Sequence, residues 1–290
     1  MPGQGASMNR KSIIAIAVLL LTALGLGALY WYQHRSAPAV EAPPVAEAPA
    51  EPAAPPSAAS AAGPPPIRHP IDTSLAEAPS APTPSDPQSM WRQGLEALLG
   101  HSAVVRFIQS SDFTQRVAAT VDNLGRPFAP PRLWPVTPTP GRFSVSGDGE
   151  LRPIAAENAG RYTPLVSMLT AIDSKRAVAL YVRMYPQLQK AYEELGYPGR
   201  YFNDRVVEVI DLLLATPEPP APGPLMQLTE VKGSVPSKQP WLRYEYADPA
   251  LEALSSGQRI LLRVGAAHRQ ALKAKLTEVR KLVTRAPVSR

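Results

Sequence analysis

An apolar stretch near the N-terminus restricts what this chain can fold into more than any other feature. It begins at Ile13, ends at Tyr32 and contains no charged residue. At about 1.5 Å rise per residue, a helix of this length spans roughly 30 Å, the thickness of the hydrocarbon core of a bilayer. We therefore expect residues 13–32 to be a transmembrane helix in contact with the lipid bilayer.

The residues around this stretch predict its orientation. Arg10 and Lys11 precede it, and no acidic residue lies before them. Because positively charged flanks stay in the cytoplasm, we expect residues 1–12 to be cytoplasmic and the rest of the chain to be exported. A cleaved signal peptide is the alternative, but its apolar region is usually shorter, about 7–15 residues. Ala23 and Gly27 leave open a structural dimer formed through this helix.

The next segment, residues 33–89, is rich in alanine and proline and contains many of the 35 prolines of the chain. It has too few large apolar side chains to offset the entropy lost on ordering. Such tracts favour extended polyproline II structure, with a rise of about 3.1 Å per residue. We interpret it as a disordered spacer between the membrane and a folded domain.

Residues 90–286 carry the patterns of a folded, mainly α-helical domain. Apolar residues recur at helical spacing, most clearly between residues 165 and 195, and the pairs Asp86–Pro87 and Asp248–Pro249 are typical of helix starts. Residues 225–231 and 241–246 alternate as strands do, so we expect at most a small β-hairpin. Two proline-rich loops, 127–149 and 216–240, separate these elements.

Several classes of chemistry are excluded by what the sequence lacks. The chain has no cysteine, so disulfides, thiolate metal sites and a cysteine nucleophile are impossible. It also lacks the zinc-protease, serine-hydrolase, P-loop and dinucleotide-binding motifs. We therefore expect no cofactor, no metal and no assigned catalytic residue.

The net charge of +6 is concentrated near the C-terminus. A basic helix there suggests an anionic partner, such as an acidic protein surface, lipid headgroups or cell-wall polymer, and a solvated helix face is the alternative. Nucleic acid is not expected for an exported domain. The candidate basic partner-binding face consists of Arg269, Lys273, Lys275, Arg280 and Lys281.

Two polar clusters form a candidate ligand site or polar core. Their residues are Asp122, Asn123, Tyr201, Asn203, Asp204, Arg205 and Glu208. Asp204 and Glu208 are one helical turn apart, and paired carboxylates can carry out acid–base chemistry or bind a hard cation. The structural alternative is that Asn203 or Asp204 caps the helix, while Arg205 pairs with Glu208 or Asp122.

Four ordered stretches carry a family resemblance. They are RVAATVDNL (116–124), LYVRMYPQLQKAYEELGYP (180–198), YFNDRVVEVIDLLLATP (201–217) and YEYADPALEALSSGQRILLRVG (244–265). In these stretches the chain resembles the bacterial domain-of-unknown-function family numbered 3014. The resemblance implies a single-pass inner-membrane protein of a Gram-negative envelope with a periplasmic domain, and it assigns no catalytic residue.

These observations lead to two hypotheses about function. The first is a non-enzymatic helical domain, held in the periplasm by a membrane anchor, that binds a protein or cell-wall partner. The alternative is an envelope enzyme of the cell-wall hydrolase type that uses Asp204 and Glu208. That enzyme requires both carboxylates in an open cleft, free of capping and pairing.

Overall fold

The computed structural model of the protein describes residues 65–76, 86–229 and 243–284. The predicted transmembrane helix at residues 13–32 lies outside them, as does much of the predicted spacer. Within the described ranges, no helix is both long enough and apolar enough to cross a bilayer.

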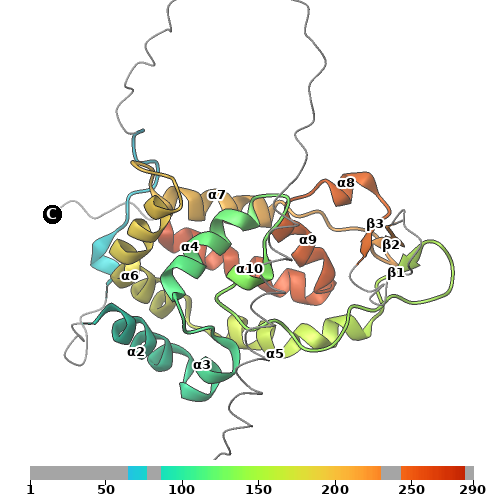
Figure 1. Ribbon diagram of the computed structural model, residues 1–290, viewed down its shortest axis with the longest axis horizontal. Coiled ribbons are helices and arrows are strands. Elements are labelled where there is room, and N and C mark those ends of the chain that lie inside the picture. Colours follow the sequence, from blue (N-terminus) through green and yellow to red (C-terminus); the bar gives the residue numbers. More distant parts are fainter. Residues whose placement is uncertain (1–64, 77–85, 230–242, 285–290) are drawn as a thin grey trace, which may run out of the picture. The chain divides into compact units, whose positions relative to one another are not determined.

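The described part of the chain is mainly α-helical, as the sequence predicts (Figure 1). Two short 3₁₀ helices, η1 (Thr73–Leu75) and η2 (Pro131–Leu133), accompany the α-helices. The nine α-helices described are α2 (Pro87–Leu99), α3 (His101–Phe107), α4 (Phe113–Leu124), α5 (Glu157–Ala171), α6 (Ser174–Glu194), α7 (Phe202–Leu214), α8 (Pro249–Glu252), α9 (Ser256–Arg263) and α10 (Ala266–Val283).

Side-chain caps set several helix starts. The carboxylate of Asp86 accepts a hydrogen bond from the backbone N–H of Ser89, and Asp248 accepts one from Ala250. In both helices proline follows the cap, where its missing N–H costs nothing. Both predicted Asp–Pro helix starts are therefore confirmed.

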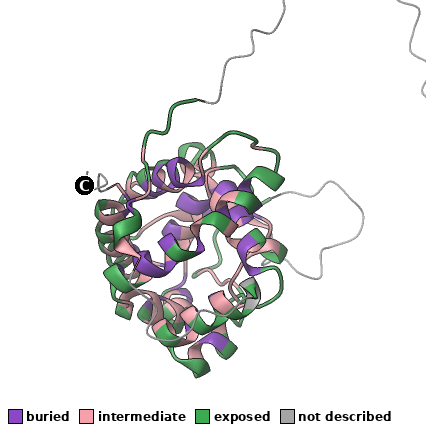
Figure 2. Cartoon of the chain, turned by 90° about the vertical axis from the view of Figure 1, so that its left-hand side faces the viewer, coloured by how far each residue is buried: buried purple, intermediate pink, exposed green. Residues whose placement is uncertain are grey.

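Helix α6 is central to the core, because it packs against α2, α4, α7 and α10. On one side its apolar residues join the aromatic pair Trp91 and Phe113, whose ring centroids are 4.6 Å apart. On the other side Val178 and Val182 of α6 contact Val207 of α7 and residues of α10. Figure 2 shows the result as buried residues alternating with exposed ones along the helices.

A small antiparallel sheet lies beside the helices, with the strand order β1 (Arg152–Pro153), β2 (Leu225–Leu228) and β3 (Tyr244–Tyr246). Strands β2 and β3 form the expected hairpin, with Met226 opposite Tyr246. Both side chains are buried against Leu262 of α9, which attaches the hairpin to the helices. Strand β1 adds a third strand that the sequence pattern did not indicate.

Part of the predicted spacer is folded against the domain. Residues 65–76, which we call the strap, include η1 and lie alongside α6 (Figure 1). Ile71 and Leu75 pack on the apolar cluster formed by α6, α7 and α10. These two large apolar side chains give the strap a buried surface that an alanine- and proline-rich composition does not predict.

A pair of glycine substitutions tests the packing of α9 on its neighbours. A Cβ atom at Gly257 would lie 2.7 Å from Leu213 Cδ2 and 2.9 Å from the backbone oxygen of Leu124. We expect Gly257→Ala to destabilise the protein by about 1–3 kcal/mol, because α9 would have to move away from α4 and α7.

Gly160 is the matched control, since a Cβ atom there meets no atom within 4 Å and the residue is exposed within α5. Gly160→Ala should stabilise the protein by about 1 kcal/mol through helix propensity. Urea unfolding followed by tryptophan fluorescence measures both changes. Equal effects of the two substitutions would contradict the packing described for Gly257.

Candidate functional site

The two polar clusters of the sequence meet where the end of α4 contacts α7. Arg205 Nε lies 3.2 Å from Asp122 Oδ1, and Arg205 Nη2 donates to the backbone oxygen of Asp122 at 2.8 Å. Arg205 Nη1 also lies 2.9 Å from Glu208 Oε1. The predicted pairing of Arg205 is therefore confirmed with both carboxylates.

The carboxylate of Asp122 is buried and has further polar partners. Arg126 Nη2 lies 2.9 Å from Asp122 Oδ2, and the Tyr197 hydroxyl donates to the same oxygen at 3.1 Å. The Asp122 carboxylate raises the pKa of Arg126. A buried charge is tolerated only when it is paired and hydrogen-bonded, and these contacts meet that condition.

The helix-capping prediction for Asn203 and Asp204 is wrong. Tyr201 occupies the cap position of α7 and makes no side-chain cap, while both polar residues lie in the first turn. There they bind the strap. Asp204 Oδ1 accepts from the backbone N–H of His69 at 2.7 Å, and Oδ2 accepts from that of Arg68 at 3.1 Å.

Asn203 is fully buried, and both ends of its amide are bound. Its Nδ2 donates to the backbone oxygens of His69 at 2.8 Å and Val283 at 3.0 Å. Its Oδ1 accepts from the Tyr181 hydroxyl at 3.0 Å, and burial raises the pKa of that tyrosine well above its usual value. Asn203 therefore ties together α6, α7, α10 and the strap.

Asn123 is the remaining polar candidate of α4, and its side chain makes a hydrogen bond within that helix. Its Nδ2 donates to the backbone oxygen of Ala119 at 2.7 Å, and its backbone oxygen accepts from the Ser256 hydroxyl at 2.8 Å. It does not line the cavity that adjoins the other candidates.

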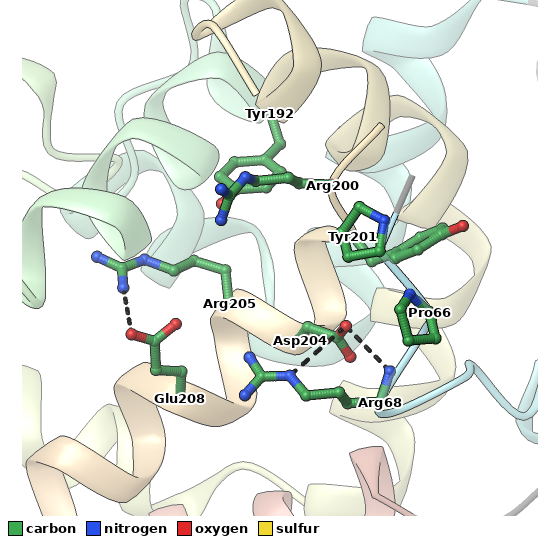
Figure 3. A pocket seen from close by; sticks show the side chains of 9 residues that line it. Pro66, Arg68, Tyr192, Arg200, Tyr201, Asp204, Arg205 and Glu208 are labelled. Carbon is green, nitrogen blue, oxygen red and sulfur yellow. Dashed lines mark hydrogen bonds and ion pairs between the residues drawn. The ribbon is translucent and has the colours of Figure 1, made fainter. Parts of the chain in front are cut away.

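A cavity of about 290 Å³ lies between α7 and the strap (Figure 3). Three guanidinium groups and two carboxylates border it, together with two tyrosine rings and two prolines. The lining residues are Pro65, Pro66, Arg68, Tyr192, Arg200, Tyr201, Asp204, Arg205 and Glu208.

The arginines of this cavity differ in how far they are neutralised. Arg205 is paired with two carboxylates, as described above. Arg68 Nε lies 4.0 Å from Asp204 Oδ2, and the Arg68 side chain is 64% exposed. The exposed side chain of Arg200 forms no ion pair with any residue in the described ranges. The cavity therefore keeps guanidinium donors available to an anionic group.

The two carboxylates are less available. Asp204 accepts two backbone N–H groups, and Glu208 is paired with Arg205. Among residues 65–76, 86–229 and 243–284, no group of three His, Cys, Asp or Glu side chains is arranged to hold a metal ion.

The first part of the candidate basic face points into the protein. Arg269 is 3% exposed and donates through Nε to Glu218 Oε2 at 2.8 Å. Lys273 Nζ lies 2.8 Å from Glu218 Oε1. Both cations therefore attach α10 to the loop that follows α7.

Two other members of this face are also paired. Lys275 pairs with Glu278 of the same helix at 2.9 Å and donates to the backbone oxygen of Ile172 at 2.9 Å, and Arg280 Nη2 donates to Asp211 Oδ2 of α7 at 2.9 Å. Lys281 is exposed. The charge that the sequence places on this helix is thus largely neutralised within the domain.

Sequence reasoning missed five residues of the cavity, namely Pro65, Pro66, Arg68, Tyr192 and Arg200. Arg200 and Tyr192 lie close to the predicted cluster in the sequence, so their proximity to Tyr201 was an available signal. Arg68 had no such signal, because it lies in the predicted spacer and reaches the site only through the docking of the strap.

The buried carboxylate of Asp122 yields a stability prediction. Asp122→Asn removes the charge that neutralises Arg205, whose side chain is only 17% exposed. We expect a loss of about 2–3 kcal/mol in the free energy of unfolding.

Asp112→Asn is the control, because Asp112 is exposed, makes no side-chain cap and has a left-handed backbone that asparagine adopts readily. It should change stability by less than about 0.5 kcal/mol. Urea unfolding checks both variants, and a similarly small loss in Asp122→Asn would disprove the central role of its ion pairs.

The contact of α10 with Glu218 yields a pH prediction. Hydrogen bonds from Arg269 and Lys273 lower the pKa of Glu218 from 4.5 to about 2. The unfolded chain therefore binds more protons between these values, and the stabilisation present above pH 4.5 is lost as the pH falls towards 2. At pH 7, Glu218→Gln should be less stable than wild type by about 1 kcal/mol, allowing for solvent screening of a half-exposed group.

The stability difference between wild type and Glu218→Gln should disappear on acidification. Thermal unfolding between pH 7 and pH 2 measures this convergence, with Glu150→Gln, at an exposed loop position, as the control. A stability difference between wild type and Glu218→Gln that stays constant with pH would refute this prediction.

The family comparison covers the elements that form this site. A family model described as "Protein of unknown function (DUF3014)" matches residues 113–280, which is more than half of the chain. The match contains the Asp122 and Arg205 ion pair and leaves out the strap. No curated protein and no solved structure matches the chain. The protein belongs to the family of proteins of unknown function DUF3014.

Proposed function

We propose that this protein is a non-enzymatic component of the bacterial envelope whose helical domain binds carboxylate groups of a peptide partner. The cavity between α7 and the strap is the proposed site. The observation that carries the proposal is Arg200, an exposed guanidinium at the cavity that forms no ion pair within the described part of the chain.

Carboxylate is the anion that we propose for this lining. A guanidinium presents a planar fork of donors that matches a carboxylate, and charge-assisted hydrogen bonds of this kind are the strong ones. The three arginines outnumber the two carboxylates, so the lining has a positive excess. The half-buried ring of Tyr201 adds aromatic surface for the side chains of a peptide.

The geometry favours binding over hydrolysis. A glycosidase requires two carboxyl groups, one to protonate the leaving group and one to attack or to activate water. Here Asp204 accepts two backbone N–H groups and Glu208 pairs with Arg205, so both are engaged. The cell-wall hydrolase that uses these residues is therefore the weaker candidate.

The proposed location rests on the sequence outside the described ranges. An uncharged apolar stretch at residues 13–32, basic residues before it and a proline-rich segment after it support a periplasmic domain held by an inner-membrane anchor. In that compartment, carboxylate-bearing peptides occur in acidic segments of envelope proteins and in the peptide part of the cell-wall polymer.

The test uses the full-length chain in detergent micelles. An acetylated tetraglutamate peptide should bind saturably, and Arg200→Gln should weaken binding about tenfold, because one charge-assisted pair is lost. Arg183→Gln is the control, since Arg183 is exposed on α6 and does not line the cavity. Binding should also weaken as salt screens the charges.

Two further arms identify the source of the carboxylate. Immobilised full-length chain is offered detergent-solubilised envelope proteins or, separately, isolated cell-wall polymer. Capture that is lost in Arg200→Gln and kept in Arg183→Gln supports the proposal and names the source. Absence of binding in every arm would overturn it. Release of cell-wall fragments that stops in Asp204→Asn and Glu208→Gln would favour the hydrolase.

A further inference from the structure

The strap is held mainly through its main chain near the cavity. Asp204 accepts from two consecutive N–H groups, those of Arg68 and His69, while Asn203 donates to the carbonyl of His69. Contacts to backbone groups do not depend on the side chains of the bound segment, and they are the usual means of binding an extended peptide. The first turn of α7 therefore binds residues 68–69 through main-chain hydrogen bonds, as proteins bind an extended peptide ligand.

The strap has few buried side chains. Asp72 is buried, at 4% exposure, whereas residues 65–68 and Pro70 are exposed and Ile71 and Leu75 are only partly buried in the cluster they join. The family match begins at residue 113, so the strap lies outside the part of the chain that defines the family. A segment held in this way can leave the domain without dismantling its core.

The strap also forms one wall of the cavity. Pro65, Pro66 and Arg68 are lining residues, and Figure 3 shows Pro66 on the side opposite Arg205, with the Arg68 side chain running below Asp204. When the strap leaves, the cavity loses one of its three guanidinium groups and both of its prolines. The proposed binding site is therefore complete only in the docked state.

We propose that the strap is a peptide ligand of its own domain, held by Asn203 and Asp204, and that its docking is thermodynamically coupled to ligand binding in the cavity. The coupling rests on the proposed function. A ligand that binds the docked state more tightly raises the equilibrium constant for docking. Docking raises the affinity for that ligand by the same factor.

Two substitutions undock the strap without changing the cavity. Ile71→Ala and Leu75→Ala remove its apolar anchors, and neither residue lines the cavity. In the full-length chain, hydrogen–deuterium exchange measured by mass spectrometry should speed up for residues 67–76, and the tetraglutamate dissociation constant should rise about tenfold. Val105→Ala, at a 69% exposed apolar side chain of α3, should change neither quantity.

Asp204→Asn distinguishes coupling from direct electrostatics by the sign of its effect. Asp204 lines the cavity, so removal of its negative charge should tighten binding of an anionic peptide if it acts only as a neighbouring charge. If it acts by holding the strap, loss of its acceptor role should weaken binding and speed up exchange of the Arg68 and His69 amides.

The outcomes separate this proposal from the proposed function. Fast exchange of residues 67–76 in the wild type, or no change in the anchor variants, would overturn the docked strap itself. Faster exchange with unchanged tetraglutamate affinity would overturn the coupling. No peptide binding to the wild type would overturn the proposed function and the coupling. Slow exchange of the amides of residues 67–76 would in that case still show that the strap is docked. Protection that rises with protein concentration would assign the strap to a second copy of the chain.

Discussion

The burial of the Asp122 carboxylate is the constraint on which the candidate site depends. This carboxylate lies at the end of α4, and removing a charge from water is favourable only when opposite charge and hydrogen-bond donors replace the water. Arg205, Arg126 and Tyr197 supply that replacement at the carboxylate, and Arg205 also donates to the Asp122 backbone oxygen. The planar guanidinium fixes the direction from which α7 approaches α4.

That approach determines what the rest of α7 can contact. With Arg205 directed at α4, Asn203 and Asp204 in the same turn are directed at the strap. Glu208, one turn further along α7, forms an ion pair with Nη1 of Arg205. Helix α7 therefore directs the paired side chain of Arg205 towards α4. It directs Asn203 and Asp204, which bind main-chain groups, towards the strap, a segment far away in the sequence.

The sequence predicts the local part of this arrangement well. Asp–Pro pairs start α2 and α8, and the alternating residues of β2 and β3 form a hairpin, because capping and strand pairing depend on neighbouring residues. The sequence predicts that Arg205 pairs with Glu208 or Asp122, and in the structure it pairs with both. Exposure was harder to predict: Arg269 belongs to a helix of basic composition but is buried, because Glu218 in a distant loop neutralises it.

The strap shows why composition alone was insufficient. Its prolines match the tract before it, and a few larger side chains, among them Ile67, Ile71 and Leu75, distinguish it. The acceptors that hold its backbone, at Asn203 and Asp204, lie more than a hundred residues away and were expected to cap their own helix. A main-chain contact of this kind leaves no side-chain pattern in the bound segment, so only the three-dimensional arrangement reveals it.

Docking of the strap also sets where the folded domain begins along the chain. While the strap is bound the domain begins at residue 65, and after release it begins at the start of α2. The difference is roughly 20 residues, which at no more than about 3.3 Å per residue amounts to as much as roughly 65 Å of additional reach. By holding the strap, the first turn of α7 therefore limits how far α2 can lie from residue 65.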